Sequence, residues 1–205
     1  MGFLMPQQGI FPTKLPGSPT PKRTAAVREV VELMSSADIG HAIDSLARQI
    51  LERNEGARNI SLIGIRRRGV PLAERLRARL AYSNLSGPPL GILDISFYTD
   101  DLTKVARKPI VRTESPEFSV DGKTVILVDD VLYSGKTVFA ALETVTQLWQ
   151  PDSVQLCVLI DRGHRQLPIQ ADYIGRCVQT STNEVIEVRL REIDQEERVV
   201  LCEKH

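Results

Sequence analysis

Two spacings of apolar residues alternate along the chain. After Ser36, Gly69 and Lys136 the apolar residues recur every three or four positions, which is typical of amphipathic helices. Between these segments lie short continuous apolar runs rich in Val and Ile, which indicate buried strands. The pattern predicts helices from Ser36 to Asn54, over 70–80 and over 136–149, and strands over 60–65, 90–98, 124–128 and 154–160.

The order of these elements predicts the fold class. Strands that alternate with helices favour an α/β fold, an open, twisted and mostly parallel sheet with helices on both faces. The polar stretch from Thr99 to Val120 has no periodicity, and we expect a long loop there. From Tyr173 to Leu201 short pieces alternate apolar and polar residues, which predicts a small hood of short strands.

The first residues differ from the rest. Five prolines prevent a helix over residues 1–24, and the segment has few apolar residues with which to order itself: Pro6, Pro12, Pro16, Pro19 and Pro21. We therefore expect a disordered Pro-rich extension over 1–24 and one domain over 25–205. Pro12 and Pro16 also interrupt any apolar core of a secretory signal.

Composition excludes several classes of protein. Twenty-six Lys and Arg against twenty-six Asp and Glu give no net charge, so the overall basic character of a general nucleic-acid binder is missing. No apolar run reaches the length of a membrane span. Cys157, Cys177 and Cys202 are too widely spaced for a disulfide framework or a structural zinc site. A cytoplasmic protein with ordinary thiols fits these features.

The segment from Val125 to Thr137 carries the clearest chemical signal. A predicted buried strand ends in two adjacent carboxylates, Asp129 and Asp130, and a short turn with Ser134 and Gly135 leads into a helix. The unpaired N–H groups of a helix start form a seat for one phosphate. Carboxylates beside that seat are explained if they accept hydrogen bonds from the vicinal hydroxyls of a ribose 5-phosphate.

This segment has two other interpretations. The sequence Gly135-Lys136-Thr137 matches the end of a nucleotide-binding P-loop, but the position of the first glycine of that motif is occupied by Asp130. An isolated Asp-Asp pair can also end a strand as a solvated turn. The order of strand, acid pair, hydroxyl-bearing loop and helix favours the ribose phosphate site over both.

This segment resembles the phosphoribosyl-pyrophosphate (PRPP) motif of type I phosphoribosyltransferases. Three further segments, 63–70, 94–102 and 158–175, are similar to the PyrR family, which combines pyrimidine-operon regulation with uracil phosphoribosyltransferase activity. The similarity extends from about Asp38 to Leu201. It implies the type I phosphoribosyltransferase fold, with PRPP and uracil as substrates, UMP as product, and a homodimer or homotetramer.

The resemblance also implies roles for individual residues. The acid pair holds the ribose hydroxyls, Leu132 to Thr137 hold the 5-phosphate, and the Arg67–Gly69 loop holds pyrophosphate, unless its arginines are only surface charges. Mg2+ is bound mainly through PRPP and pyrophosphate oxygens, without a cluster of protein ligands. A flexible loop over about 99–112 closes on the site and contributes Lys104 and Arg107 as catalytic residues beside Asp130. The expected substrate-binding residues are Arg67, Arg68, Gly69, Asp129, Asp130, Val131, Leu132, Tyr133, Ser134, Gly135, Lys136, Thr137 and Arg162.

One position indicates the base. Purine-salvage members carry a carboxylate three residues after the acid pair, where it can handle the purine N7 proton, whereas this chain has Tyr133. The difference favours uracil, which we expect to be bound by the segment Asp161–Arg165 and the late strands. For His164 in that segment we expect a role in orienting the loop rather than in catalysis.

Two functions beyond the plain enzyme remain open. The chain could be a UMP- or PRPP-responsive RNA-binding attenuator of the pyrimidine operon, with weak enzyme activity. Asp44 in the first helix and Gln170 after the Asp161–Arg165 segment depart from the basic or neutral pattern of regulatory members, so we expect weak or absent binding of operon mRNA. A scaffold with a degenerate pocket is disfavoured because Asp129, Asp130, Gly135 and Gly69 are all present.

Overall fold

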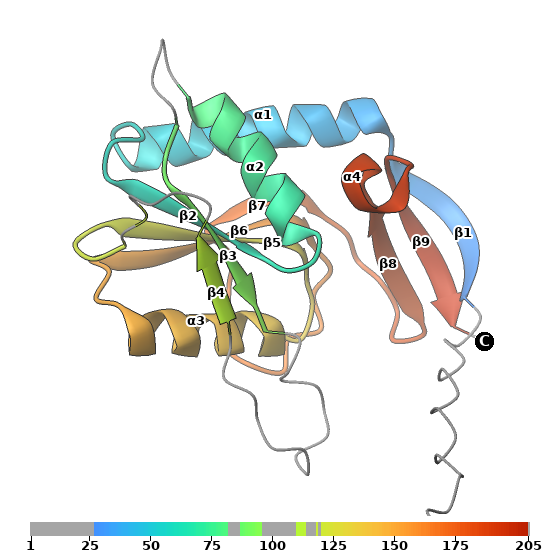
Figure 1. Cartoon of the computed structure of the whole chain (residues 1–205). Helices are drawn as coiled ribbons and strands as arrows, with labels where there is room; N and C mark the ends of the chain where they lie inside the picture. The colour runs from blue at the N-terminus through green and yellow to red at the C-terminus, as the bar shows by residue number, and fades with distance from the viewer. Residues whose placement is uncertain (1–26, 82–86, 96–109, 114–117, 119, 205) are drawn as a thin grey trace, which may run out of the picture.

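The computed structural model describes residues 27–81, 87–95, 110–113, 118 and 120–204. Its larger sheet has six strands in the order β4-β3-β2-β5-β6-β7, and all neighbours are parallel except the β3–β4 pair (Figure 1). These strands are β2 (Ile60–Ile65), β3 (Leu90–Asp94), β4 (Ile110–Thr113), β5 (Thr124–Leu132), β6 (Ser153–Asp161) and β7 (Tyr173–Cys177). The expected mostly parallel α/β sheet is thereby confirmed.

Helices cover both faces of this sheet. The helices α1 (Ser36–Arg53) and α2 (Gly69–Leu80) lie on one face, and α3 (Lys136–Leu148) lies on the other (Figure 1). Successive side chains of β5 alternate between the two cores: Ile126 and Val128 pack with α1 and α2, whereas Val125 and Leu127 pack with α3. This period of two buries the central strand on both sides, which explains its uninterrupted apolar sequence.

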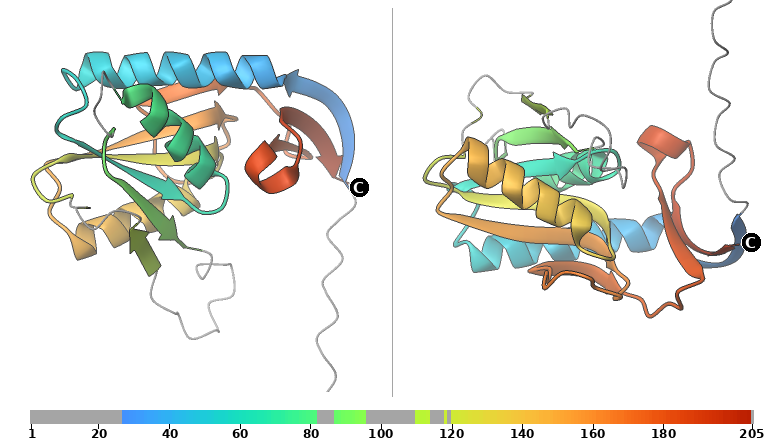
Figure 2. Two further views of the ribbon diagram at one scale, coloured as in Figure 1. Left: turned by 45° about the horizontal axis from the view of Figure 1, so that its top comes forward. Right: turned by 90° about the horizontal axis from the view of Figure 1, so that it is seen from below.

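A second, three-stranded antiparallel sheet forms the hood. Its order is β1-β9-β8, with β1 (Val27–Met34), β8 (Glu184–Arg189) and β9 (Arg198–Lys204), and the short helix α4 (Arg191–Asp194) joins β8 to β9. Ile186, Val188 and Val199 continue the core that α1 covers. The arrows of β5 and β6 point toward this hood, so the carboxyl ends of the central strands face it (Figure 2).

The structure departs from the sequence prediction in several places. The strand predicted over 90–98 ends at Asp94, and the short helix α4 lies in the tail that was predicted as short strands. The stretch 99–120, predicted as a loop, contains β4, which is only four residues long and exists by pairing with β3. Strand β1 was not predicted, because its Val30 and Val31 are about half exposed and break the alternation expected of a half-buried strand. Strand β5 was predicted to end before the acid pair, but it continues to Leu132 because Val131 and Leu132 pair with β6.

Some expectations fall outside the described residues. The extension over 1–24, most of the predicted loop over 99–112, and Lys104 and Arg107 belong to this group. Among the helices that are described, none has the length and apolar character needed to span a membrane.

Candidate active site at the carboxyl end of the central sheet

Two adjacent aspartates, Asp129 and Asp130, lie near the carboxyl end of β5. Asp129 is 6% exposed, and its Oδ1 accepts a hydrogen bond from the backbone N–H of Asp130 at 3.0 Å. Asp130 in turn accepts from the N–H of Val131 at 3.0 Å. Burial raises the pKa of both carboxyl groups, and for Asp129 the charge of Asp130 adds to the effect. The carboxyl oxygens of both residues can accept hydrogen bonds from the hydroxyl groups of a ligand.

The residues after the acid pair form the start of α3, where the sequence predicted an anion-binding site, here called the anion seat (Ser134 to Thr137). Gly135 is the N-cap of α3 in the left-handed conformation (φ 88°), and it has no side chain that could cap the helix. Within the first turn the N–H of Lys136 reaches the Oγ of Ser134 only at 3.4 Å. Helix-start N–H groups without a capping side chain can bind a phosphate directly. The structure thus brings Ser134 to Thr137 together in the form that the sequence predicted.

The connection between β2 and α2 approaches β5 closely at Gly69. A Cβ atom on Gly69 would lie 2.3 Å from the carbonyl oxygen of Val128 and 3.2 Å from the Cα of Asp129. Only glycine permits this approach. The loop that carries Arg67 and Arg68 is therefore packed directly beside the acid pair.

Arg68 connects this loop to the hood. Its Nε donates to Oδ2 of Asp194 at 3.1 Å and its Nη2 donates to Oδ1 at 2.7 Å. The same carboxylate accepts from the N–H of Leu190 at 2.9 Å, and the hydrogen bonds from Arg68 lower the pKa of Asp194. Arg68 also acts electrostatically on Asp130. One guanidinium thus lies between the hood and the acid pair.

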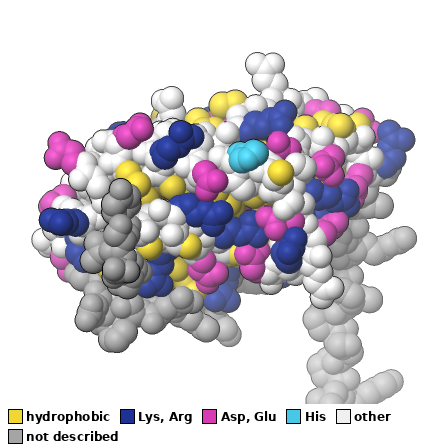
Figure 3. Space-filling model, turned by 90° about the horizontal axis from the view of Figure 1, so that it is seen from above, with side chains coloured by type: hydrophobic (Ala, Val, Ile, Leu, Met, Phe, Trp, Pro, Cys, Tyr) yellow, Lys and Arg dark blue, Asp and Glu magenta, His cyan; other side chains and the backbone are white. Residues whose placement is uncertain are grey.

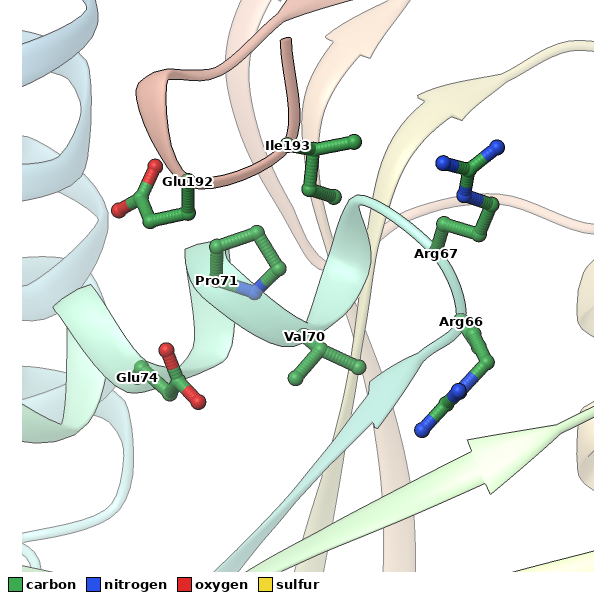
Figure 4. A pocket seen from close by; sticks show the side chains of 7 residues that line it. All are labelled: Arg66, Arg67, Val70, Pro71, Glu74, Glu192 and Ile193. Carbon is green, nitrogen blue, oxygen red and sulfur yellow. The ribbon is translucent and has the colours of Figure 1, made fainter. Parts of the chain in front are cut away.

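Arg67 lies in a different environment from Arg68. It lines a pocket of about 440 Å³ together with Arg66, residues of α2 and residues of α4, and the acid pair does not belong to this lining (Figure 4). Val70, Pro71 and Ile193 form its apolar part, while Glu74 and Glu192 stand at the end away from the arginines (Figure 4). Of the two arginines predicted to bind pyrophosphate, only Arg68 is held between the acid pair and the hood.

The segment after β6 meets the loop after β5. Arg162 is 5% exposed, and its guanidinium carbon lies 4.3 Å from the centre of the Tyr133 ring. It also donates to the carbonyl oxygen of Glu184 at 2.8 Å. The Nε2 of His164 donates to the carbonyl oxygen of Thr180 at 2.6 Å, which agrees with a role in orienting the loop. Arg162 and Tyr133 thus form one contact at the side of the site that faces β8.

Sequence reasoning missed one contributor to this site and the contacts of another. Asp194 is 126 positions from Arg68, and no motif in the tail indicates their pairing. Arg165 was predicted as part of the uracil-binding segment Asp161–Arg165, and its contacts with the backbone carbonyls of Leu132 and Tyr133 were not foreseen. Among the described residues no group of three or more His, Cys, Asp or Glu side chains could hold a metal ion.

Comparisons with known proteins identify the family. The phosphoribosyl transferase domain family matches residues 31–193. The "Bifunctional protein PyrR" of Pelotomaculum thermopropionicum is 53% identical over 176 residues, which cover 86% of this chain and 97% of that protein. The protein of the same name from Thermus aquaticus is 44% identical and covers 87% of this chain and 98% of its own length.

Solved structures show the same fold at low sequence identity. A hypoxanthine-guanine phosphoribosyltransferase from Bacillus anthracis superposes with a TM-score of 0.63 at 19% identity, over 88% of this chain and 99% of that chain. The hypoxanthine phosphoribosyltransferase of Trypanosoma cruzi gives a TM-score of 0.65 at 19% identity, over 86% of this chain and 98% of that chain.

Proposed function

The chain belongs to the PyrR family of phosphoribosyl transferase domain proteins, and on that basis we propose that it converts uracil and PRPP to UMP and pyrophosphate. In this reaction the bond from C1 of the ribose to pyrophosphate breaks, and a bond from C1 to N1 of uracil forms. The N1 proton of uracil is released. The chain has to bind the donor at three points and exclude water from C1.

The donor is held at both ends of its sugar. Asp129 and Asp130 accept hydrogen bonds from the 2- and 3-hydroxyls, and the uncapped N–H groups at the start of α3 bind the 5-phosphate. Gly69 brings backbone amides to the leaving group, and Arg68 supplies positive charge beside Asp130. The observation that carries the proposal is this order along β5, acid pair then anion seat, with the Gly69 loop packed against Val128.

Mg2+ fits this site as a cation carried by the donor. Oxygens of the donor would hold most of its coordination, and Asp129 and Asp130, beside the ribose hydroxyls, are the acidic groups that would attract it. When bound, Mg2+ neutralises charge on the departing pyrophosphate.

The base is selected on the side of the site that faces β8. Tyr133 occupies the position where a purine enzyme needs a carboxylate, and its ring is held over Arg162. Uracil has no N7 proton, so it needs no such carboxylate. The proposal therefore excludes hypoxanthine and guanine as good substrates.

The test is UMP formation from labelled uracil in the presence of PRPP and magnesium, with orotate, hypoxanthine and guanine as competitors. We expect UMP as the product and little inhibition by the purines. Absence of UMP together with absence of PRPP binding by calorimetry would overturn the proposal. Preferential use of hypoxanthine would overturn the choice of base.

The name of the relatives includes the word bifunctional, so a second function, UMP- or PRPP-responsive binding of pyrimidine-operon mRNA, is the alternative. Basic and acidic side chains are interspersed on the face seen from above, where α1 lies (Figure 3). Asp44 forms an ion pair with Arg79 at 2.9 Å, and Arg176 donates to the carbonyl oxygen of Leu33. Since these charges are engaged within the protein, we expect weak RNA binding.

A filter-binding titration against a pyrimidine-operon leader at two salt concentrations tests this alternative. Submicromolar, sequence-selective affinity that falls steeply with salt would establish the RNA function and contradict the expectation of weak binding.

A further inference from the structure

The guanidinium of Arg165 donates to five acceptors, and four of them are backbone carbonyls. Its Nη1 donates to the carbonyl oxygens of Leu132, Tyr133 and Gly163 at 3.3, 2.9 and 3.0 Å. Its Nε donates to the carbonyl of Ile169 at 3.0 Å, and its Nη2 donates to Oδ2 of Asp161 at 2.5 Å. A side chain satisfied in this way is not a free surface charge.

The segment 161–169 holds three successive carbonyls of the loop after β5. Besides the contacts of Arg165, the N–H of Arg162 donates to the carbonyl of Leu132 at 3.1 Å. The N–H groups of Gln166 and Leu167 both donate to the carbonyl of Ser134, at 3.0 and 3.2 Å. The carbonyls of residues 132, 133 and 134 are therefore all bound to this one segment.

Anchored carbonyls determine where the amides of the same loop point. In each planar peptide unit the N–H is directed opposite to the C=O. Fixing the carbonyls of 132, 133 and 134 toward the segment 161–169 turns the N–H groups of 133, 134 and 135 to the other side. Those amides lead into the anion seat at the start of α3.

Arg162, in the same segment, contacts the opposite side of the site. Its Nε donates to Oγ1 of Thr180 at 3.2 Å, and its Nη2 donates to the carbonyl of Glu184, where β8 begins, at 2.8 Å. The ring of Tyr133 lies over its guanidinium. Arg162 thus connects Tyr133 to the hood, whereas Arg165 connects the carbonyls of 132 and 133 to residues 161–169.

We propose that Arg165 and Arg162 are positioning residues and that each of them orients a different part of the site. Arg165 orients the amides that bind the 5-phosphate of the donor, and Arg162 orients Tyr133 and the start of β8, which form the base side. Arg162, which the sequence predicted as a substrate-binding residue, acts in this proposal through Tyr133 and β8, since its guanidinium contacts Thr180, Glu184 and the Tyr133 ring. The inference rests on the proposed phosphoribosyl transfer and assigns to each residue an effect on one substrate only.

Steady-state kinetics with PRPP and uracil varied separately test this division. We expect Arg165→Lys, which keeps the charge but loses the planar fork, to raise the KM for PRPP at least tenfold and the KM for uracil less than threefold. We expect Arg162→Lys to raise the KM for uracil at least tenfold and the KM for PRPP less than threefold. Arg176→Lys is the matched control, since it alters another arginine that donates to a backbone carbonyl, that of Leu33 in β1. Both KM values should stay within twofold.

A binding measurement separates this inference from the proposed function. Calorimetry with ribose 5-phosphate should show at least tenfold weaker binding for Arg165→Lys and unchanged binding for Arg162→Lys. If the wild-type protein binds ribose 5-phosphate but forms no UMP, the proposed function fails while the role of Arg165 is still decided by this titration. If the wild type binds no ribose 5-phosphate, both fail.

Two results would overturn the assignment of Arg165 to the donor and of Arg162 to the base. One is an equal rise of both KM values in both variants, which indicates general loosening of the site. The other is normal ribose 5-phosphate binding by folded Arg165→Lys. Should that variant not fold, Asp161→Asn takes its place, because it removes the carboxylate at 2.5 Å from Arg165 and should weaken ribose 5-phosphate binding in the same direction.

Discussion

The carboxylate of Asp194 accepts two hydrogen bonds from Arg68, at 2.7 and 3.1 Å, across a sequence separation of 126 residues. The pair joins α4 of the hood to the loop that precedes α2. Both side chains are less than one third exposed, so solvent screens the interaction only in part. The position of a predicted pyrophosphate ligand thus depends on an acid from the other end of the chain.

We expect the Arg68–Asp194 pair to contribute measurable stability. A double-mutant cycle with Arg68→Gln and Asp194→Asn, followed by urea unfolding, should give a coupling free energy of about 1–2 kcal/mol. The pKa of Asp194 is lowered in the folded state, so this contribution is present above the ordinary carboxyl pKa and is lost as the pH falls through the folded value.

The exposed pair Arg79–Asp44 is the control for this cycle. Its side chains are 43% and 54% exposed, and we expect a coupling of no more than about 0.5 kcal/mol. Equal coupling in the two pairs would contradict the special role of Asp194.

Gly69→Ala should destabilise the protein by about 2 kcal/mol or more and weaken PRPP binding. The new Cβ would overlap the carbonyl of Val128, so either the loop or β5 has to shift beside the acid pair. Gly40→Ala is the control, because a Cβ at that helical position meets nothing within 4 Å. Alanine there should stabilise the protein by about 0.5–1 kcal/mol. Urea unfolding and calorimetry with PRPP measure both effects.

Much of this fold could be predicted from the sequence because its strongest signals are local. The apolar spacing predicted α2 over 70–80, one residue after its start at Gly69, and it predicted the start of α3 at Lys136. Strand β2 was predicted to the residue. The order of acid pair, Gly135 and helix start is likewise contained in nine consecutive residues, so the anion seat could be predicted as a unit.

The remaining features depend on contacts between distant segments. Strand β1 is held by pairing with β9, in which Lys204 lies opposite Val27. Apolar and polar residues do not alternate along β1. Arg165 could be recognised as basic, but its five acceptors come from loops whose backbone path no sequence pattern specifies. Pairing partners of this kind appear only when the chain is folded.

Tyr133 is expected to act through its ring rather than its hydroxyl. Tyr133→Phe keeps the ring over Arg162 and should leave kcat/KM for uracil within about twofold. Tyr133→Asp should lose uracil activity without gaining hypoxanthine activity, since the new carboxylate would pair with Arg162 at this short range. Steady-state assays with both bases decide the matter, and hypoxanthine turnover by Tyr133→Asp would show that the carboxylate alone selects the base.

Asp129→Asn should separate stability from function. Asparagine retains an oxygen that can accept from the N–H of Asp130, so the loop geometry is preserved, while the buried charge is removed. Burial raises the pKa of Asp129, so ionisation of this carboxyl group destabilises the folded state. This destabilisation is absent below the ordinary pKa of 3.8 and grows as the pH rises toward the pKa of the folded state. The variant should therefore have a Tm equal to or higher than that of the wild type at pH 8, and this difference in Tm should shrink on acidification.

Binding of PRPP by Asp129→Asn should nevertheless fall at least tenfold, because one acceptor for the ribose diol is weakened. Thermal unfolding at several pH values, together with calorimetry, tests both parts. A lower Tm at pH 8 would mean that the Asp129 charge stabilises the fold, and normal PRPP binding would remove Asp129 from the sugar site.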